Sequence, residues 1–388
     1  MRILVVTVVH HPEDARILHR QIAALRERGH QVTYAAPFAA RQAVPRPDVE
    51  GLDLPRAVGR DRRTALRAAR ALLAGRGAEA DVVLLHDPEL LLALPGTMRR
   101  WTSAGRTPVV VWDVHEDTAA ALVMKPWLPA VLRPPVRTAV RAAERLAERR
   151  VRLLLAEDAY QERFRRAHPV VPNLPLVPPA PPEPPGPDRA VYLGHLSRAR
   201  GALDLVETAR LLTPDVRVEV IGAADPDVRG PLTEADRAGV LRWHGYLPND
   251  QALALLSGAL TGLSLLHDQP NYRHSRPTKV GEYMAHGLPV VTTPTPLAAD
   301  LVERHGCGFV VPYGDPAAVA EAVRRLRDDE GLRRECAERG RAAALAELDW
   351  TERAAEFVDR LEMWVKEAQA EAGTRPRLAV AGDATGPF

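Results

Sequence analysis

Residues 174–194 read LPLVPPAPPEPPGPDRAVYLG, a proline-rich run that leads directly into an apolar, strand-like segment. Eight prolines fall within residues 174–188, and proline suits neither the interior of a helix nor a central strand. Such a run favours extended polyproline geometry and acts as a semi-rigid spacer. The sequence therefore predicts a linker at residues 174–188 with one domain on each side of it.

Before the linker, short apolar runs alternate with segments of helical period, which is the pattern of parallel α/β units. An amphipathic helix is expected near residues 15–28, and Gly29 provides its stop signal. Residues 1–173 are therefore predicted to form a Rossmann-like domain. Its strands are expected at residues 2–9, 31–36, 81–85, 108–112 and 151–156.

After the linker the same alternation begins again, so residues 189–350 are predicted to form a second Rossmann-like domain. A closing helix is expected at residues 351–371, followed by a disordered tail at residues 372–388. Open parallel sheets bind ligands at the carboxyl ends of their strands, so the cleft between two facing domains is the expected site. The second set of strands is expected at residues 190–194, 216–221, 240–243, 261–265, 288–293 and 309–311.

The composition argues against several classes of function. The chain has 388 residues with 52 basic and 50 acidic side chains, so nucleic acid is not an expected partner. Its apolar runs are far shorter than the roughly 18–20 residues of a membrane span, and we expect no signal peptide. Cys307 and Cys336 are too few for a disulfide framework or a structural zinc site. We expect a bacterial, cytoplasmic protein.

The segment most informative about chemistry is residues 274–291, HSRPTKVGEYMAHGLPVV. Pro277 suits the first turn of a helix, and Gly287 ends that helix. A helix N-terminus offers unpaired N–H groups and a positive dipole end, which suit a diphosphate. Lys279 would add a cation, and Glu282 on the same helix face could accept hydrogen bonds from ribose hydroxyls. The alternative interpretation is an i,i+3 salt bridge on an ordinary surface helix.

The pattern P-x-K-x-x-E-Y-M-A-x-G-x-P-V-V at residues 277–291 resembles the donor-binding segment of family 4 of the GT-B retaining glycosyltransferases. Other segments similar to those of the family cover most of the chain in a compatible order. This resemblance implies a GT-B fold, in which two doubly wound, Rossmann-like α/β domains face each other across a cleft. The further matches are YLGHLSRARG at 192–201, GFVVPYGDP at 308–316, Leu348-Asp349-Trp350, His86-Asp87-Pro88-Glu89, Asp113-Val114-His115-Glu116 and Asn173.

The resemblance also implies roles for particular residues. Arg200 corresponds to the basic residue that holds the donor pyrophosphate, and Lys279 is its companion. Glu282 corresponds to the second glutamate of the E-x7-E motif, which is associated with the nucleotide ribose. His115 corresponds to the first-domain histidine that reaches toward the donor sugar and the reacting centre. The implied donor-binding residues are Gly194, His195, Arg200, His274, Ser275, Lys279 and Glu282.

Two positions depart from the family pattern. His274 replaces the first glutamate of E-x7-E, which removes a carboxylate that could act as nucleophile or stabiliser. Glycosyltransferases of the S-x-P-x-K-x-x-E type tolerate this change, so we do not interpret it as loss of activity. His195 replaces the arginine of the G-R-L motif, and an unperturbed histidine titrates near pH 6.5.

No metal or cofactor is expected. Arg200, Lys279 and the helix near Pro277 would supply the positive charge that a leaving nucleoside diphosphate requires. The D-x-D string at residues 225–227 is interpreted as turn chemistry rather than as a divalent-metal site. The lack of a G-x-G-x-x-G motif argues against a dinucleotide cofactor. Metal-independent transfer with retention of configuration is what the resemblance implies.

Four residues near predicted strand ends of the first domain are candidates for the acceptor side. His11, Asp14 and Arg16 follow the first strand and could contact the acceptor or the donor phosphate. Alternatively, Asp14 caps the helix and Arg16 lies on its solvated face. His86 ends another predicted strand, where a structural hydrogen bond is the alternative interpretation.

Arginines recur at every fourth position from Arg133 to Arg149 and would form a stripe along one helix. Such a stripe could bring the protein into peripheral contact with anionic lipid at the inner membrane face. A solvated helix face is the alternative, because Glu144 and Glu148 are interspersed among the arginines.

These features predict a retaining glycosyltransferase that moves a sugar from a nucleoside-diphosphate sugar to an acceptor hydroxyl. The acceptor could be a natural product, a glycan or a lipid-linked intermediate, and the nucleotide, the sugar and the oligomeric state are not indicated. Two alternatives are a catalytically silent sugar-nucleotide-binding partner or activator, and a sugar-nucleotide epimerase of the same architecture. His274 in place of glutamate argues against the epimerase, which needs carboxylates around the sugar.

Overall fold

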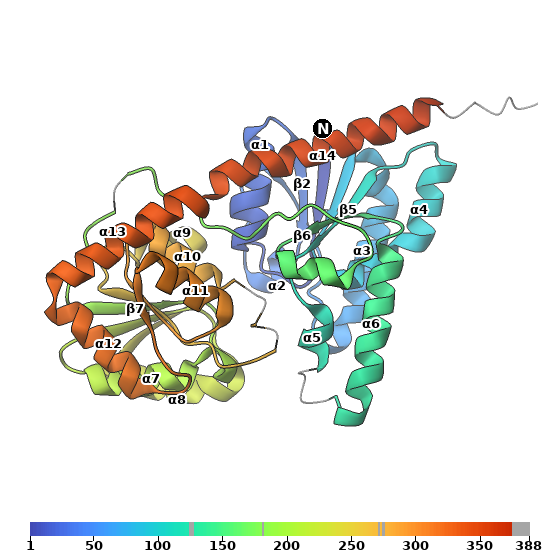
Figure 1. Ribbon diagram of the computed structural model, residues 1–388. Coiled ribbons are helices and arrows are strands. Elements are labelled where there is room, and N and C mark those ends of the chain that lie inside the picture. Colours follow the sequence, from blue (N-terminus) through green and yellow to red (C-terminus); the bar gives the residue numbers. More distant parts are fainter. Residues whose placement is uncertain (124–127, 181, 271, 274–275, 375–388) are drawn as a thin grey trace, which may run out of the picture.

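The computed structural model describes residues 1–123, 128–180, 182–270, 272–273 and 276–374 (Figure 1). Two six-stranded parallel sheets follow one another along the chain, with strand orders β3-β2-β1-β4-β5-β6 and β12-β11-β10-β7-β8-β9. Counted from the start of each half, both orders are 3-2-1-4-5-6, the order of the Rossmann fold. The predicted pair of doubly wound α/β sheets is therefore confirmed.

The first unit consists of the first sheet and the helices that cover it (Figure 1). Its strands are β1 (Arg2–Val6), β2 (Gln31–Ala36), β3 (Glu50–Asp53), β4 (Val82–Leu85), β5 (Val109–Val114) and β6 (Arg152–Leu155). Its α-helices are α1 (Ala23–Glu27), α2 (Phe38–Arg41), α3 (Arg62–Arg76), α4 (Leu94–Ser103), α5 (Thr118–Val123) and α6 (Arg133–Ala147). The π-helix η1 (Ala15–Ile22) precedes α1, and the 3-10 segments are η2 (Gly59–Asp61), η3 (Gly77–Glu79), η4 (Pro88–Ala93), η5 (Ala130–Leu132) and η6 (Asp158–Arg163).

Strand β1 shows why the apolar runs of the sequence predicted this sheet. Ile3 and Val5 point into one hydrophobic cluster, whereas Leu4 and Val6 point into the cluster on the opposite face. A strand covered on both faces is apolar at every position, as parallel strands usually are. Strand β3 escaped prediction because its sequence EGLD is short, polar and at the sheet edge.

The second unit consists of the second sheet and its helices. Its strands are β7 (Arg189–Leu193), β8 (Arg217–Ile221), β9 (Leu241–Gly245), β10 (Thr261–Ser264), β11 (Val290–Thr292) and β12 (Gly308–Val310). Its helices are η7 (Arg198–Arg200), α7 (Ala202–Leu212), α8 (Pro226–Arg237), α9 (Asn249–Ala254), α10 (Thr278–Ala285), α11 (Pro296–His305), α12 (Pro316–Asp328) and α13 (Glu330–Glu347), and the chain continues into α14 (Trp350–Thr374).

The proline-rich linker is fixed against the second unit rather than suspended between the units. Proline lacks an N–H group but keeps its carbonyl, and arginines of α13 use these acceptors. Arg341 donates to the Pro178 carbonyl at 2.7 Å, and Arg333 donates to the Pro185 carbonyl at 3.0 Å. The linker therefore follows a defined path across the surface of α13.

Helix α14 leaves the second unit and lies across the first (Figure 1). Its side chains Phe357, Leu361 and Trp364 are buried, and Glu362 meets His30 at 3.0 Å between carboxylate and imidazole. The predicted closing helix is therefore present, but it extends to Thr374, so residues 372–374 are helical rather than part of a tail. The rest of the predicted tail, residues 375–388, lies outside the described residues.

We expect the docking of α14 to contribute strongly to stability. Replacing the fully buried Phe357 by alanine should lower the free energy of unfolding by about 3–5 kcal/mol, because it leaves a cavity. Replacing Met363, which is 38% exposed on the same helix, by alanine should change the free energy of unfolding by less than about 0.5 kcal/mol. Urea unfolding followed by tryptophan fluorescence measures the free energy of unfolding of both variants. Equal losses in the Phe357 and Met363 variants would contradict the docking of α14.

Candidate active site

The candidate site lies where the carboxyl ends of the two sheets face each other. In each sheet the strand order reverses beside the first strand, between β1 and β4 and between β7 and β10. Loops leave such a switch point in opposite directions and open a crevice for a ligand. The predicted residues fall there: His11, Asp14 and Arg16 after β1, His86 after β4, His115 after β5, Gly194, His195 and Arg200 after β7, and Lys279 and Glu282 on α10.

Lys279 is a buried basic residue that contacts an aromatic ring. Its ammonium Nζ lies 3.6 Å from the centroid of the Tyr192 ring and has no hydrogen-bond acceptor among the described residues. Burial and the positive charge of Arg200 hold the pKa of Lys279 well below its usual value. An uncompensated buried charge is unfavourable, so this arrangement indicates a position for an anionic group.

Arg200 stands beside Lys279, as the sequence analysis anticipated. Its guanidinium lies near the side chains of Tyr192 and Tyr272. Burial acts to lower the pKa of Arg200, but interactions with Tyr192 and Tyr272 outweigh it, so the group is firmly charged. The loop after β7 and the start of α10 thus bring two cationic side chains close to each other.

Gly194 provides space rather than a hydrogen bond. Its N–H group already donates to the Ile221 carbonyl at 2.8 Å. A side chain here would meet the Lys279 Cε at 3.5 Å, and φ is +124°, a conformation that favours glycine. On the neighbouring strand, a Cβ at Gly222 would lie 2.0 Å from the Gly194 carbonyl oxygen. The two backbones therefore approach closely beneath the pair of cations.

Glu282 is buried and paired with a residue that the sequence did not indicate. One carboxylate oxygen forms an ion pair with Arg20 of η1, and Arg20 also donates to the Asn173 side-chain oxygen at 2.8 Å. The other carboxylate oxygen has no hydrogen-bond partner in the described part of the chain. The alternative of a surface salt bridge between Lys279 and Glu282 is therefore wrong, because both are buried and Glu282 pairs across the two units.

His195 and the D-x-D string form exposed pairs. The His195 Nε2 lies 2.8 Å from an Asp225 carboxylate oxygen, and Arg198 donates to Asp227 at 3.0 Å. The string begins helix α8 with Pro226 in its first turn, so it is a helix start rather than an isolated turn. Each aspartate is already in contact with a basic side chain. The remaining donor-side candidates, His274 and Ser275, lie outside the described residues.

Asp113 is the centre of the polar cluster in the first unit. Arg16 binds both of its carboxylate oxygens at 2.7 Å, and Gln21 donates to one of them at 3.1 Å. Burial alone would raise the pKa of Asp113, but the guanidinium outweighs it and holds the pKa well below the usual range. The interpretation that places Arg16 on a solvated helix face is therefore wrong, because the residue is only 3% exposed.

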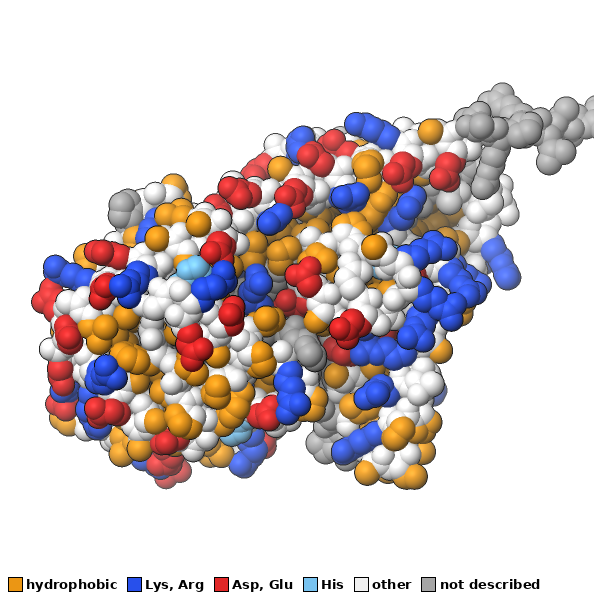
Figure 2. Space-filling model, viewed as in Figure 1, with side chains coloured by type: hydrophobic (Ala, Val, Ile, Leu, Met, Phe, Trp, Pro, Cys, Tyr) orange, Lys and Arg blue, Asp and Glu red, His pale blue; other side chains and the backbone are white. Residues whose placement is uncertain are grey.

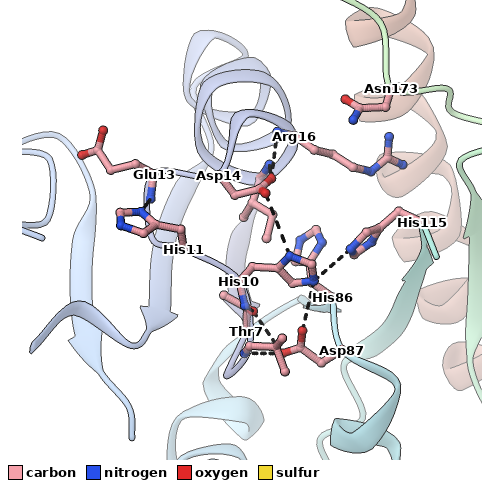
Figure 3. Close-up of polar contacts among 12 residues, drawn as sticks. Thr7, His10, His11, Glu13, Asp14, Arg16, His86, Asp87, His115 and Asn173 are labelled. Carbon is pink, nitrogen blue, oxygen red and sulfur yellow. Dashed lines mark hydrogen bonds and ion pairs between the residues drawn. The ribbon is translucent and has the colours of Figure 1, made fainter. Parts of the chain in front are cut away.

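The imidazole of His115 is held at both nitrogens, and Figure 3 shows its contact with His10. Its Nδ1 lies 3.1 Å from the Asp113 carbonyl oxygen, and its Nε2 lies 3.0 Å from the Nε2 of His10. Burial acts to lower the pKa of His115, but the hydrogen bond and charge of Asp113 raise it overall. Sequence reasoning missed His10, which also meets Asp87 at 3.3 Å. The only available signal was its place directly after β1.

Asp14 and His11 have structural partners. The Asp14 carboxylate accepts hydrogen bonds from the backbone N–H groups of Arg16 and Ile17, so the predicted helix cap is confirmed. The His11 Nδ1 lies 3.0 Å from the Tyr246 hydroxyl of the second unit. Burial and nearby Arg41 lower the pKa of His11 to about 4, so it is neutral near pH 7.

His86, Asp113 and His115 are close enough to suggest a metal site, since one ligand atom of each lies within 4.8 Å of the others. The residues present do not fit a divalent cation. Both Asp113 oxygens face the Arg16 guanidinium, which a cation would have to displace. The His86 Nδ1 lies 3.3 Å from Asp113, and burial lowers the pKa of His86, which favours its neutral form. His86 is therefore a neutral neighbour of the Arg16–Asp113 ion pair rather than a member of it.

The arginines of α6 are not one uniform stripe. Arg141 forms ion pairs with Asp117 and Glu144, at 2.7 and 2.9 Å. Arg133 and Arg137, in the first turns of the same helix, are exposed and have no acidic partner among the residues described. In the predicted stripe, Arg141 is therefore neutralised by acidic side chains, whereas Arg133 and Arg137 have no acidic partner in the described part of the chain. No described helix meets the length and hydropathy needed to cross a bilayer.

Comparison with known proteins relates both the second unit and the whole fold to glycosyltransferases. Residues 198–359 match a family described as glycosyl transferase-like. Over 158 residues the chain is 25% identical to the capsular polysaccharide biosynthesis glycosyltransferase CapM of Staphylococcus aureus. That match covers 39% of this chain and 39% of CapM, so the chain spans about two fifths of its curated relative.

Two solved structures are similar over nearly the whole chain. Sucrose-phosphate synthase from Thermosynechococcus elongatus has a TM-score of 0.68 at 16% identity, covering 96% of this chain and 100% of that one. Anabaena HepE in complex with UDP and glucose has a TM-score of 0.66 at 16% identity, with coverages of 94% and 100%. These similarities confirm the predicted GT-B fold.

Replacing Asp113 by asparagine should lower the free energy of unfolding at pH 7 by about 3–5 kcal/mol, because Arg16 is left buried and unpaired. The pKa of Asp113 is lower in the folded state than its unfolded value of 3.8. The ionised carboxylate therefore stabilises the folded state at pH values above 3.8. This contribution is lost as pH falls through the folded pKa, so the two stability curves should converge in acid. Chemical unfolding between pH 7 and 2 measures both curves.

A matched control for that substitution is Asp359→Asn, which removes an exposed ion pair with Arg28. It should cost at most about 1 kcal/mol, since water and salt screen exposed pairs. If the Asp113 variant were no less stable than this control, the buried pair would not have the importance assigned to it.

Proposed function

We propose that this chain is a glycosyltransferase of the family 4, retaining type, which moves a sugar from a nucleoside-diphosphate sugar to an acceptor hydroxyl. The observation that carries the proposal is the buried, unpartnered ammonium of Lys279 beside Arg200. A bound diphosphate would supply the anionic partner that the structure does not show beside these two cations among the described residues. The match of residues 198–359 to a glycosyl transferase-like family includes both residues and supports the assignment.

Charge development in the reaction explains why two cations are needed. Breaking the bond between the sugar and the diphosphate leaves negative charge on the diphosphate oxygens. Preorganised cations that face this charge stabilise the transition state more than the ground state. Lys279 and Arg200 would perform this role together with the N–H groups at the start of α10. In this proposal they replace a divalent metal, so transfer is metal-independent.

The remaining residues have narrower roles. The free carboxylate oxygen of Glu282 is available for a ribose hydroxyl, while its partner oxygen holds Arg20. His115 would orient the transferring sugar from the first unit, with its imidazole fixed by Asp113 and His10. His195 would act at the edge of the donor site, because it is exposed and already paired with Asp225.

The donor is identified by thermal-shift measurements against nucleotide sugars and free nucleotides, with and without EDTA. A ligand at about 100 times its dissociation constant should stabilise the fold by roughly 2.7 kcal/mol. We expect one nucleotide family to raise the melting temperature equally in both conditions. A shift that EDTA abolishes would contradict metal-independent binding, and no shift with any nucleotide would contradict the donor site.

Replacing Lys279 by alanine should reduce turnover by about 10²–10³-fold, the effect typical of losing one group that stabilises developing charge. The folded protein without ligand should not be destabilised by loss of this charge, because the ammonium is buried and unpartnered. Lys366→Ala, on the exposed side of α14, is the matched control and should retain normal turnover. Near-normal activity of the Lys279 variant would remove its assigned role.

A further inference from the structure

A cavity lies between the two units, away from the pair of cations described above. Its volume is about 610 Å³, and it separates the first turns of α6 from the loop that follows β10. Residues of both units line it, which places it at the mouth of the cleft. Arg133, Pro134, Arg137 and Thr138 form one wall, and Gln269 and Pro270 form the other.

The charge of this cavity is uncompensated. Arg133 and Arg137 are exposed, lie one helical turn apart and have no ion-pair partner within the described ranges. Asp268, which precedes Gln269 of the opposite wall, already accepts hydrogen bonds from Nε and Nη2 of Arg273, each at 3.0 Å. Arginines in this arrangement favour a phosphate or carboxylate, which a guanidinium binds in a bidentate manner.

An exposed apolar surface adjoins the two arginines. The 3-10 segment η5 leads directly into α6, and its Val131 and Leu132 are 79% and 47% exposed. Figure 2 shows hydrophobic side chains beside basic ones at the free lower end of the first unit, where α6 begins in Figure 1. Exposed apolar groups next to a cationic cavity match a ligand with a charged head and an apolar chain.

The cavity is connected to the proposed donor site through the loop after β10. Gln269 and Pro270 line the cavity, and Tyr272, two residues later, lies near the Arg200 guanidinium. A molecule in the cavity would therefore lie beside the residues that hold the donor diphosphate. This is the place where the second substrate of a transfer reaction has to enter.

We propose that this cavity is an acceptor subsite for a phosphate-bearing amphiphile. The phosphate group lies between Arg133 and Arg137, and the apolar chain follows Val131 and Leu132. This inference rests on the proposed glycosyltransferase function, because it assigns the class of the second substrate. The paired arginine Arg141 takes no part, since its charge is already neutralised by Asp117 and Glu144.

Binding of monododecyl phosphate below its micelle concentration tests the proposal by isothermal titration calorimetry. The double variant Arg133→Gln/Arg137→Gln should weaken binding at least tenfold. The matched control Arg149→Gln/Arg150→Gln removes the same charge from exposed positions that do not line the cavity, and should change binding less than twofold. Equal losses in the two double variants would overturn the proposal, because they would indicate attraction by net charge alone.

The apolar part of the site has its own test. Val131→Ser/Leu132→Ser should weaken binding of dodecyl phosphate at least fivefold, and methyl phosphate should bind the unaltered protein at least tenfold more weakly. Dodecyl maltoside, which has the same chain without a phosphate, should also bind at least tenfold more weakly. Equal binding of the maltoside, or unchanged binding by the serine variant, would overturn the assignment.

Vesicles separate the two sources of such a ligand. Co-sedimentation is measured with phosphatidylcholine vesicles and with vesicles that also contain one fifth phosphatidic acid. Capture by the second kind alone, lost in the Arg133/Arg137 variant, supports a lipid presented at a membrane. Binding of dodecyl phosphate without vesicle capture supports a dissolved acceptor, and binding of neither overturns the subsite. The nucleotide-induced thermal shift should persist in every variant, so failure here is distinguishable from failure of the proposed function.

Discussion

The buried ion pair between Arg16 and Asp113 fixes the architecture of the first unit's ligand-facing edge. It joins the first turn of η1 to the end of β5, and Arg16 also donates to the Val171 carbonyl at 2.9 Å, just before the linker. His115 and His86 then take their orientation from the same carboxylate. A charge pair of this kind tolerates burial because each ion satisfies the other, and removal of either one leaves an isolated charge.

The second unit shows the opposite arrangement of a buried charge. Lys279 is as deeply placed as a core residue, but its neighbours are the Tyr192 ring and another cation, Arg200. The charges of Arg16 and Asp113 thus neutralise each other, whereas Lys279 and Arg200 have no carboxylate partner among the described residues. This difference supports the proposed division of labour, in which the second unit binds the anionic donor and the first positions the sugar and the acceptor.

The fold was largely predictable because parallel strands such as β1 are apolar on both faces, and proline punctuation separates the two sheets. Lys279 and Arg200 were predictable because they lie in local motifs near helix starts. The pairs Arg16–Asp113 and Arg20–Glu282 were not, since they join residues far apart along the chain. The path of α14 onto the first unit was equally hidden, because an amphipathic pattern identifies a buried face but not its partner.

The return of α14 means that the chain passes between the units twice. The two crossings are held together, because the Trp350 N–H donates to the Pro175 carbonyl at 2.8 Å. The Arg20–Glu282 pair and the bond between Asn173 and Thr278 lie beside the first crossing. A rotation of one unit against the other would therefore pivot near these two crossings. The cavity beside α6 lies away from these crossings (Figure 1). Its two walls would therefore move apart the most in such a rotation, and they would set how wide the mouth of the cleft opens.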